Sequence, residues 1–304
     1  MGASILVPAT SANLGPGFDS FGLALGLYNE FDGELAATWS IEIGGEGAGR
    51  LSTGPDNEVL RAMARVFAEV GEPGLAAEVT CHNGIPVGRG LGSSAAAIVG
   101  GLVLGDALTG AQLGKRRLLE IAVEIEGHAD NVGAALYGGF TVAFDSGHGS
   151  EVARIDPVGG LAALVVLGEQ ELFTADSRAA LPATVPHADA ALNAGHAALV
   201  ALGIATGSRG YLEAGLQDAI HERYRRELIP DLEAVRSLLE AIGAGHAVLS
   251  GAGPTVLALL QDLNDARALE RARALAEVAR TALEGLGRGR VLALPIDRGG
   301  AREA

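Results

Sequence analysis

The stretch Pro86-Val87-Gly88-Arg89-Gly90-Leu91-Gly92-Ser93-Ser94-Ala95-Ala96-Ala97 decides the fold that we predict for this chain. Its three alternate glycines lack a Cβ, so a ligand can approach the backbone and N–H groups can turn toward one point. The two serines are placed to cap a helix, and the apolar run that follows, up to about Leu108, is typical of a buried helix. A glycine-rich turn before a helix favours an anion such as phosphate, because free N–H groups and the helix dipole attract negative charge.

The spacing of this stretch excludes two common phosphate-binding motifs. A Walker A motif needs a lysine after its second glycine, whereas the only lysine in the chain is Lys115. The dinucleotide motif Gly-x-Gly-x-x-Gly fails because Ser93 stands in the position of its third glycine. Taken alone, the stretch is either a phosphate loop of another type or a tight turn before a core helix.

The composition predicts a folded protein without a nucleic-acid or membrane partner. The 304 residues suffice for one large or two ordinary domains, and 48% of them are hydrophobic. The formal net charge of −15 disfavours nucleic acid and anionic membranes, since both require a basic surface. No apolar run approaches the roughly 20 residues of a membrane helix. The lack of a signal-peptide pattern and the single cysteine, Cys81, lead us to expect a cytoplasmic protein.

A polar stretch near the amino terminus predicts a second part of a site. Residues 5–7 predict a short strand, and residues 9–22 show no helical or strand period, which predicts a loop rich in small polar residues. This loop is either a plain surface connection or a binding loop. Asn13 and Asp19, which lie close to aromatic residues such as Phe18, favour a binding loop.

The remaining hydrophobic patterns predict strands and helices without regular βαβ repetition, which favours an α+β fold over a doubly wound sheet. We expect strands over residues 23–27, 31–35, 39–43, 77–81, 136–144, 161–167, 247–249, 256–260 and 291–294, and helices over 57–70, 95–108, 115–126, 188–202, 208–219, 229–242 and 266–286.

Two further polar stretches lie between these elements. Glu126-Gly127-His128-Ala129-Asp130-Asn131-Val132 places several polar groups where a glycine ends a helix, although many ordinary turns share this pattern. Ser250-Gly251-Ala252-Gly253-Pro254-Thr255 lies between two predicted strands and, alone, suits a bulged hairpin.

Together these stretches resemble the GHMP kinases (galactokinase, homoserine kinase, mevalonate kinase and phosphomevalonate kinase) over essentially the whole chain. Residues 86–95 are similar to the ATP-phosphate loop of the family, residues 8–19 to its first motif and residues 250–255 to its third. Residues 126–132 are similar to the form seen in the branch that acts on homoserine, where proline usually occupies the position of Ala129.

The resemblance implies a two-domain architecture and two cofactors. We expect a ribosomal-protein-S5-like βαβ domain that binds ATP over residues 1–147, a ferredoxin-like domain over residues 148–304, and ATP and Mg²⁺ as cofactors. The loop from Pro86 to Ala97 corresponds to the family's phosphate loop. Ser94 and Glu126 correspond to its metal ligands, with Glu124 as the alternative because glutamates two positions apart point to different faces of a helix.

The resemblance also implies an amino-acid substrate. A zwitterion needs a carboxylate for its ammonium group and a guanidinium for its carboxylate. Asp19 corresponds to the first, and two arginines, in the segments 174–178 and 221–225, correspond to the second; Arg223 and Arg226 flank the latter site. The substrate-binding residues implied in this way are Asn13, Asp19, His128, Thr174, Arg178 and Arg225.

The catalytic residues implied by the resemblance are Asn131, Arg178 and Arg225. Several GHMP relatives have an aspartate as base where this chain has Asn131, so no general base is evident. A loose transition state tolerates this absence, because the acceptor hydroxyl needs little early deprotonation. We therefore expect direct attack of the hydroxyl on the γ-phosphate, with Asn131 orienting it.

The resemblance therefore implies a kinase that phosphorylates the hydroxyl of L-homoserine, in threonine biosynthesis. One alternative is another GHMP kinase with an alcohol substrate such as mevalonate, which Asn131 and the two arginines disfavour. A second is a silent GHMP-fold ligand sensor, which the presence of Ser94, Glu126 and the loop glycines disfavours. The expected partners are L-homoserine and ATP, and a homodimer is the only protein assembly that we consider.

Overall fold

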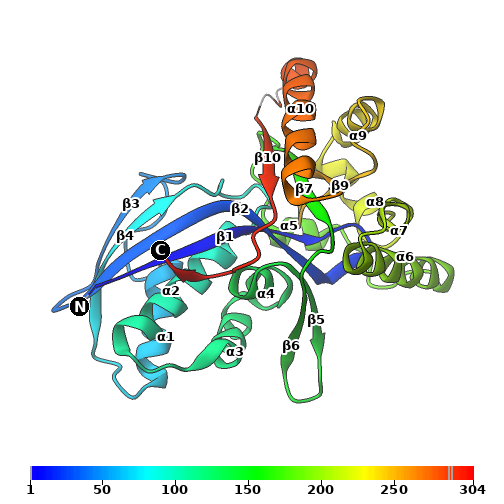
Figure 1. The fold of residues 1–304 in the computed structure, drawn as a ribbon. Coiled ribbons are helices and arrows are strands. Elements are labelled where there is room, and N and C mark those ends of the chain that lie inside the picture. Colours follow the sequence, from blue (N-terminus) through cyan, green and yellow to red (C-terminus); the bar gives the residue numbers. More distant parts are fainter. Residues whose placement is uncertain (1, 287, 289) are drawn as a thin grey trace.

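Two β-sheets organise the part of the chain that the computed structural model describes, namely residues 2–286, 288 and 290–304 (Figure 1). The larger sheet has seven strands and the smaller sheet has four. Each sheet buries a face against its own set of helices, so the protein has two hydrophobic cores. Both cores include residues of the smaller sheet.

The larger sheet is built on two long antiparallel strands, and only its last pair of strands runs parallel. Its path is β11-β1-β2-β4-β3, with β5 on β2 and β6 on β5. The strands are β1 (Ala3–Asn13), β2 (Gly17–Ala36), β3 (Ser40–Gly45), β4 (Ala76–Asn83), β5 (Phe140–Asp145), β6 (Ser150–Ile155) and β11 (Arg302–Glu303). The helices of this part are α1 (Glu58–Glu69), α2 (Ser93–Thr109), α3 (Gly114–Glu126) and α4 (Asp130–Tyr137). Among them, α2 and α4 pack on β1 and β2.

The smaller sheet is antiparallel throughout, in the order β10-β7-β9-β8. Its strands are β7 (Gly160–Val166), β8 (Ala247–Leu249), β9 (Val256–Asp262) and β10 (Val291–Pro295). The chain between β7 and β8 forms α5 (Thr174–Ala179), α6 (His187–Thr206), α7 (Arg209–Gly215), α8 (Glu222–Arg225), a 3₁₀ turn (Arg226–Leu228) and α9 (Leu232–Ala241). After β9 come α10 (Asp265–Leu283) and a second 3₁₀ turn (Glu284–Leu286).

The prediction of an α+β fold with two GHMP-type domains is confirmed. The carboxy-terminal part runs from β7 through helices to β8 and β9, and then through α10 to β10. In its sheet the first strand, β7, lies between the fourth, β10, and the third, β9, which is the ferredoxin-like arrangement. Every residue of β7 is buried, since alternate side chains face α9 and α10 on one side and the main core on the other. The continuous apolar run at 161–167 therefore indicated a strand covered on both faces.

The loop predicted over residues 9–22 is wrong for most of its length. Strand β1 continues past Pro8 to Asn13, and β2 already begins at Gly17. The pairing of β1 with β2 shifts register directly after Pro8 and again before Asn13, and such irregularities accommodate a proline. Because nearly all residues in 7–14 are buried, this part of the strand shows no alternation of polar and apolar residues.

The strand predicted over residues 136–144 is wrong in its first part. The helix α4 extends to Tyr137, and β5 starts only at Phe140. Gly138 and Gly139 separate the two elements, both with a φ of +71°. The small residues of α4 carry no clear helical period, which is why the pattern did not reveal this short helix.

Helix α6 corrects the expectation that no segment resembles a membrane span. This helix has 20 residues, and the mean hydropathy of an 18-residue window within it is 1.3, so by length and composition alone it could cross a membrane. In the structure 22% of that window is buried. Its Asn193 is buried, donates to the carbonyl of Pro16 and accepts from the N–H of Ala219. These bonds tie α6 to the turn between β1 and β2 and to the segment between α7 and α8.

Candidate active site

The glycine-rich loop between β4 and α2 has the conformation that its sequence requires. Gly88, Gly90 and Gly92 have φ angles of +67°, +75° and +69°. A Cβ on Gly90 would lie 2.3 Å from the carbonyl oxygen of Ser250, and one on Gly92 would lie 1.9 Å from Oγ1 of Thr10. The loop is therefore held against β1 and against the turn 250–255, so that only glycine fits at these positions.

The first turn of α2 is open to a ligand. Gly92 is the residue before the helix, and no side chain accepts a hydrogen bond from the N–H groups of the first turn. The predicted capping role of Ser93 and Ser94 is therefore wrong, since both lie within the helix. Free N–H groups at the start of a 17-residue helix favour an anion, and the phosphate site that the sequence indicated here stays a prediction.

A cavity of about 430 Å³ lies in front of this loop, and it gathers most of the predicted site. From the predicted phosphate loop it is lined by Val87, Gly88, Arg89, Gly90, Gly92, Ser93, Ser94 and Ala97, but not by Pro86, Leu91, Ala95 or Ala96. From the other predicted residues it is lined by Asn13, Asp19, Glu126, His128, Asn131, Thr174, Arg178 and Arg225. The sequence did not indicate a third group of lining residues, which includes Ile43, Leu51, Val59, Cys81 and Asn83.

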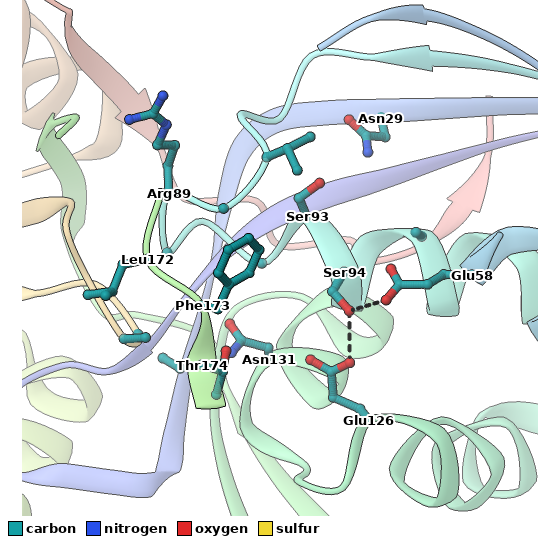
Figure 2. Close-up of a pocket in the computed structure, with 18 of the residues that line it drawn as sticks. Asn29, Glu58, Arg89, Ser93, Ser94, Glu126, Asn131, Leu172, Phe173 and Thr174 are labelled. Carbon is teal, nitrogen blue, oxygen red and sulfur yellow. Dashed lines mark hydrogen bonds between the residues drawn. The ribbon is translucent and has the colours of Figure 1, made fainter. Parts of the chain in front are cut away.

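Two carboxylates share the hydroxyl group of Ser94 (Figure 2). The Ser94 Oγ lies 3.0 Å from Oε2 of Glu126 and 3.1 Å from Oε1 of Glu58. Burial raises the pKa of the Glu126 carboxyl, and the negative charges of Glu58 and Asp130 act in the same direction. Two partly buried carboxylates that lie this close together are stabilised by a nearby cation.

The oxygen atoms around Ser94 suit Mg²⁺. This ion prefers oxygen ligands and is usually held by one or two carboxylates, with phosphate oxygens and water completing its shell. No larger cluster of His, Cys, Asp or Glu that could hold a metal is found among residues 2–286, 288 and 290–304. Glu124, the alternative ligand, is half exposed and pairs with Arg65 at 2.6 Å. The geometry supports Glu126 as the metal ligand and adds Glu58 as a second candidate. Glu58 lies outside the sequence motifs, so the sequence did not indicate it.

Asn131 is oriented from the amino-terminal sheet. The Thr10 hydroxyl donates to Oδ1 of Asn131 at 2.8 Å, and the backbone N–H of Asn131 donates to the Asp130 carboxylate at 2.7 Å. With Oδ1 engaged, the Nδ2 group of the amide is left as a donor toward the cavity. Thr174, at the start of α5, lines the same cavity as Asn131.

His128 is held by a carboxylate beside the cavity. Its Nδ1 lies 2.6 Å from Oδ1 of Asp130, and its Nε2 lies 4.0 Å from Glu126. The hydrogen bond to Asp130 raises the pKa of His128, against the effect of burial. His128 thus belongs to the cavity wall, and its ring orientation is set by Asp130.

Asp19 and Arg178 form a bidentate ion pair across the mouth of the cavity. Arg178 donates from Nη2 to Oδ1 of Asp19 at 2.7 Å and from Nη1 to Oδ2 at 3.0 Å. Asn13 supports this arrangement, because its Oδ1 accepts from the N–H of Asp19 at 3.0 Å and its Nδ2 donates to the carbonyl of Gly251 at 2.9 Å.

Arg225 is a buried cation with neutral partners. Only 2% of it is exposed, and its Nη1 lies 3.0 Å from both Nδ1 of His221 and the carbonyl oxygen of Gly251. Among the described residues no carboxylate forms an ion pair with it, and burial lowers the pKa of its guanidinium. The two flanking arginines, Arg223 and Arg226, pair with Asp189 and Glu233 and do not line the cavity.

The ring of Phe18 contacts both Arg178 and Arg225. Phe18 was not predicted as a site residue from the sequence. The guanidinium carbons of Arg178 and Arg225 lie 5.8 and 5.6 Å from the centre of its ring. The ring also stacks on His221, with 5.1 Å between ring centres. Cation–π contacts of this kind favour two positive groups side by side, where they would otherwise repel.

Comparison with known proteins identifies the same family over both parts of the chain. The family model of the GHMP kinases N terminal domain matches residues 57–139, and that of the GHMP kinases C terminal domain matches residues 190–277. The homoserine kinase of Nostoc punctiforme is 40% identical over 267 residues, which are 86% of this chain and 86% of the relative. The homoserine kinase of Streptomyces avermitilis is 42% identical over 262 residues, 85% of each chain.

Solved structures agree with these relatives. The crystal structure of homoserine kinase from Cytophaga hutchinsonii superposes with a TM-score of 0.88 at 26% identity, covering 100% of this chain and 97% of that one. A putative homoserine kinase from Listeria monocytogenes gives a TM-score of 0.78 at 31% identity, covering 99% and 98%. With the family matched in both domains and homoserine kinases near 40% identity along most of its length, this chain belongs to the GHMP kinase family.

Proposed function

We propose that this chain is an ATP-dependent kinase that phosphorylates the hydroxyl of L-homoserine to O-phospho-L-homoserine in threonine biosynthesis. One observation carries the proposal beyond the similarity to relatives. A single cavity joins an open helix start, which suits a triphosphate, to an aspartate and two arginines, which suit an amino-acid zwitterion.

The nucleotide would lie along the glycine loop. The N–H groups at the start of α2 would bind phosphate oxygens, and the apolar wall formed by Ile43, Leu51 and Val87 would accept the base. Ser94, Glu126 and Glu58 would hold Mg²⁺, which neutralises charge on the transferred phosphoryl group when it is bound. The chain's own negative charge makes these local groups necessary, since its net charge of −15 does not attract ATP.

The amino acid would lie on the other side of the cavity. Asp19 would bind the ammonium group, and Arg178 and Arg225 would bind the carboxylate. Asn131, whose amide is oriented by Thr10, would donate to the acceptor hydroxyl and hold it toward the γ-phosphate. The hydroxyl oxygen would bond to phosphorus while the bond from phosphorus to the leaving ADP oxygen breaks, and the hydroxyl proton would pass late to an oxygen of the transferred phosphoryl group.

Three further features stay predictions. We propose that the two domains divide at residues 147 and 148, within the turn between β5 and β6. We also propose that the protein acts in the cytoplasm and that it binds neither nucleic acid nor membranes. The homodimer stays a prediction that sedimentation analysis of the purified protein would test.

The proposed function is tested by ADP release with ATP, Mg²⁺ and separate acceptors: L-homoserine, L-serine, mevalonate and galactose. We expect turnover with homoserine, and a fall in kcat of at least about tenfold with little change in KM in Asn131→Ala. Turnover with mevalonate instead would keep the kinase and refute the amino-acid site. ATP binding without turnover on any acceptor would support the ligand sensor.

A further inference from the structure

The groups assigned to the two charges of the substrate already neutralise each other. Asp19 and Arg178 are joined by two hydrogen bonds of 2.7 and 3.0 Å, and the side chain of each is 38% exposed. A bidentate pair of this geometry is among the stronger ion pairs of proteins. Any ligand that uses either group must first separate them.

Asp19 is the better fixed member of this pair. Its backbone has a φ of +55°, in the left-handed region, and its N–H is bound by Asn13, which in turn reaches Gly251 in the other domain. Arg178 comes from the six-residue helix α5, 159 positions from Asp19 in the sequence. The pair therefore joins two separate walls of the amino-acid site.

Together with Asp19 and Arg178, Arg225 forms a cluster that has more positive than negative charge. The cluster holds one carboxylate and two guanidinium groups, and Arg225 has only neutral partners among the described residues. A substrate carboxylate therefore finds one cation ready, whereas a substrate ammonium group that binds at Asp19 must first displace Arg178.

We propose that the Asp19–Arg178 pair fills the empty amino-acid site and makes it selective for zwitterions. This inference rests on the proposed function. A zwitterion replaces both partners at once, since its ammonium group takes the place of Arg178 at Asp19 and its carboxylate takes the place of Asp19 at Arg178. One ion pair is lost and two are formed. A ligand with only one of these charges breaks the pair and leaves a half-buried charge without a partner, which is costly.

The test uses two analogues of homoserine that each lack one charge. The analogue 3-amino-1-propanol lacks the carboxylate, and 4-hydroxybutanoate lacks the ammonium group. Dissociation constants of both analogues and of L-homoserine are measured by calorimetry, without ATP, for the wild type, Arg178→Gln and Asp19→Asn. Circular dichroism and thermal unfolding establish that each variant is folded.

The expected result is a gain of affinity in the variants for the analogue that uses the freed group. Arg178→Gln should bind 3-amino-1-propanol about three- to tenfold more tightly than the wild type, because Asp19 no longer has a competing partner. Asp19→Asn should bind 4-hydroxybutanoate more tightly by a similar factor. L-homoserine should bind at least about tenfold more weakly to both variants.

The inference is overturned if both variants lose affinity for homoserine while neither analogue gains, since the two residues would then be ordinary ligand contacts. Because each variant tests the pair separately, misfolding of one leaves the other decisive. Arg223→Gln is the matched control, because Arg223 pairs with Asp189 outside the cavity, and it should leave all three affinities unchanged. Wild-type ADP release with homoserine reports the proposed function separately, so the two failures are distinguishable.

Discussion

At the scale of single residues, the site combines groups that the sequence motifs indicate with groups that only the fold brings near. Ser94 and Glu126 belong to recognisable motifs, and the structure places their oxygen atoms 3.0 Å apart. Glu58 lies in the first turn of α1, outside any motif, and completes the same cluster. Its role depends on how α1 packs against α2, which no local pattern reveals.

The first prediction concerns these carboxylates. Glu126→Gln should lower kcat by about 10²-fold or more and raise the Mg²⁺ concentration needed for half-maximal rate, because a metal ligand is lost. Glu58→Gln should shift the Mg²⁺ requirement in the same direction. The matched control is Glu124→Gln, which removes the exposed partner of Arg65 and should change the rate less than twofold. Equal effects of the three substitutions in a Mg²⁺ titration would contradict the assignment.

At the scale of elements, the glycine-rich loop is where sequence and structure agree most closely. The alternate glycines have the positive φ angles that such a turn requires, and the atoms that approach Gly90 and Gly92 closely are the protein's own, where the sequence led us to expect a ligand. The failures share one physical cause. Strand β1 and helix α4 bury polar residues such as Thr10 and Asp130 together with apolar ones, so neither a period of 2 nor one of 3.6 is visible in them.

The substrate side of the cavity illustrates a different limit of sequence reasoning. Arg225 could be named from its motif, but that it is buried beside His221 and stacked on Phe18 follows only from the packing of three distant segments. Likewise, that Asp19 and Arg178 bond to each other requires contacts between residues 159 positions apart. Motifs identify such groups, and tertiary structure decides their partners.

The second prediction tests the loop as an element. Gly92→Ala should reduce the free energy of unfolding by at least about 3 kcal/mol and abolish tight ATP binding, because the new methyl group would overlap the Thr10 hydroxyl. Gly110 is the control, since it also has a positive φ but a Cβ there meets nothing within 4 Å. Gly110→Ala should cost only about 1 kcal/mol and leave ATP affinity unchanged. Urea unfolding and ATP titration measure both effects, and similar losses in the two variants would refute the close-packing argument.

At the scale of the whole molecule, the single cysteine reports whether the larger sheet is intact. Cys81 lies on β4, is 2% exposed, and burial raises the pKa of its thiol to about 12. Below that pH the folded protein keeps the thiol protonated, whereas an unfolded chain ionises it near its ordinary pKa of about 8.5. The unfolded state therefore binds fewer protons above about pH 8.5, and this group makes folding less favourable as the pH rises from there toward 12.

The third prediction follows from this protection. At pH 8 iodoacetamide should modify the native protein at least about 10²-fold more slowly than the protein in concentrated urea, since the reagent requires an accessible thiolate. The rate should rise along the unfolding curve followed by circular dichroism. Rapid modification of the native protein, without loss of circular dichroism signal, would show that Cys81 is more accessible than the structure indicates.

The strand β11 has a consequence for how the protein is made. After β10, the last described residues return to the larger sheet, where Arg302 and Glu303 pair with β1 and the Asp297 carboxylate accepts from Tyr28 (Figure 1). A ribosome synthesises β1 first and this returning segment only after the entire ferredoxin-like domain. During translation the edge of β1 that later pairs with β11 therefore has no partner strand, and strands of other nascent chains can pair with it. The sheet of the amino-terminal domain is therefore completed only after the ferredoxin-like domain has been synthesised.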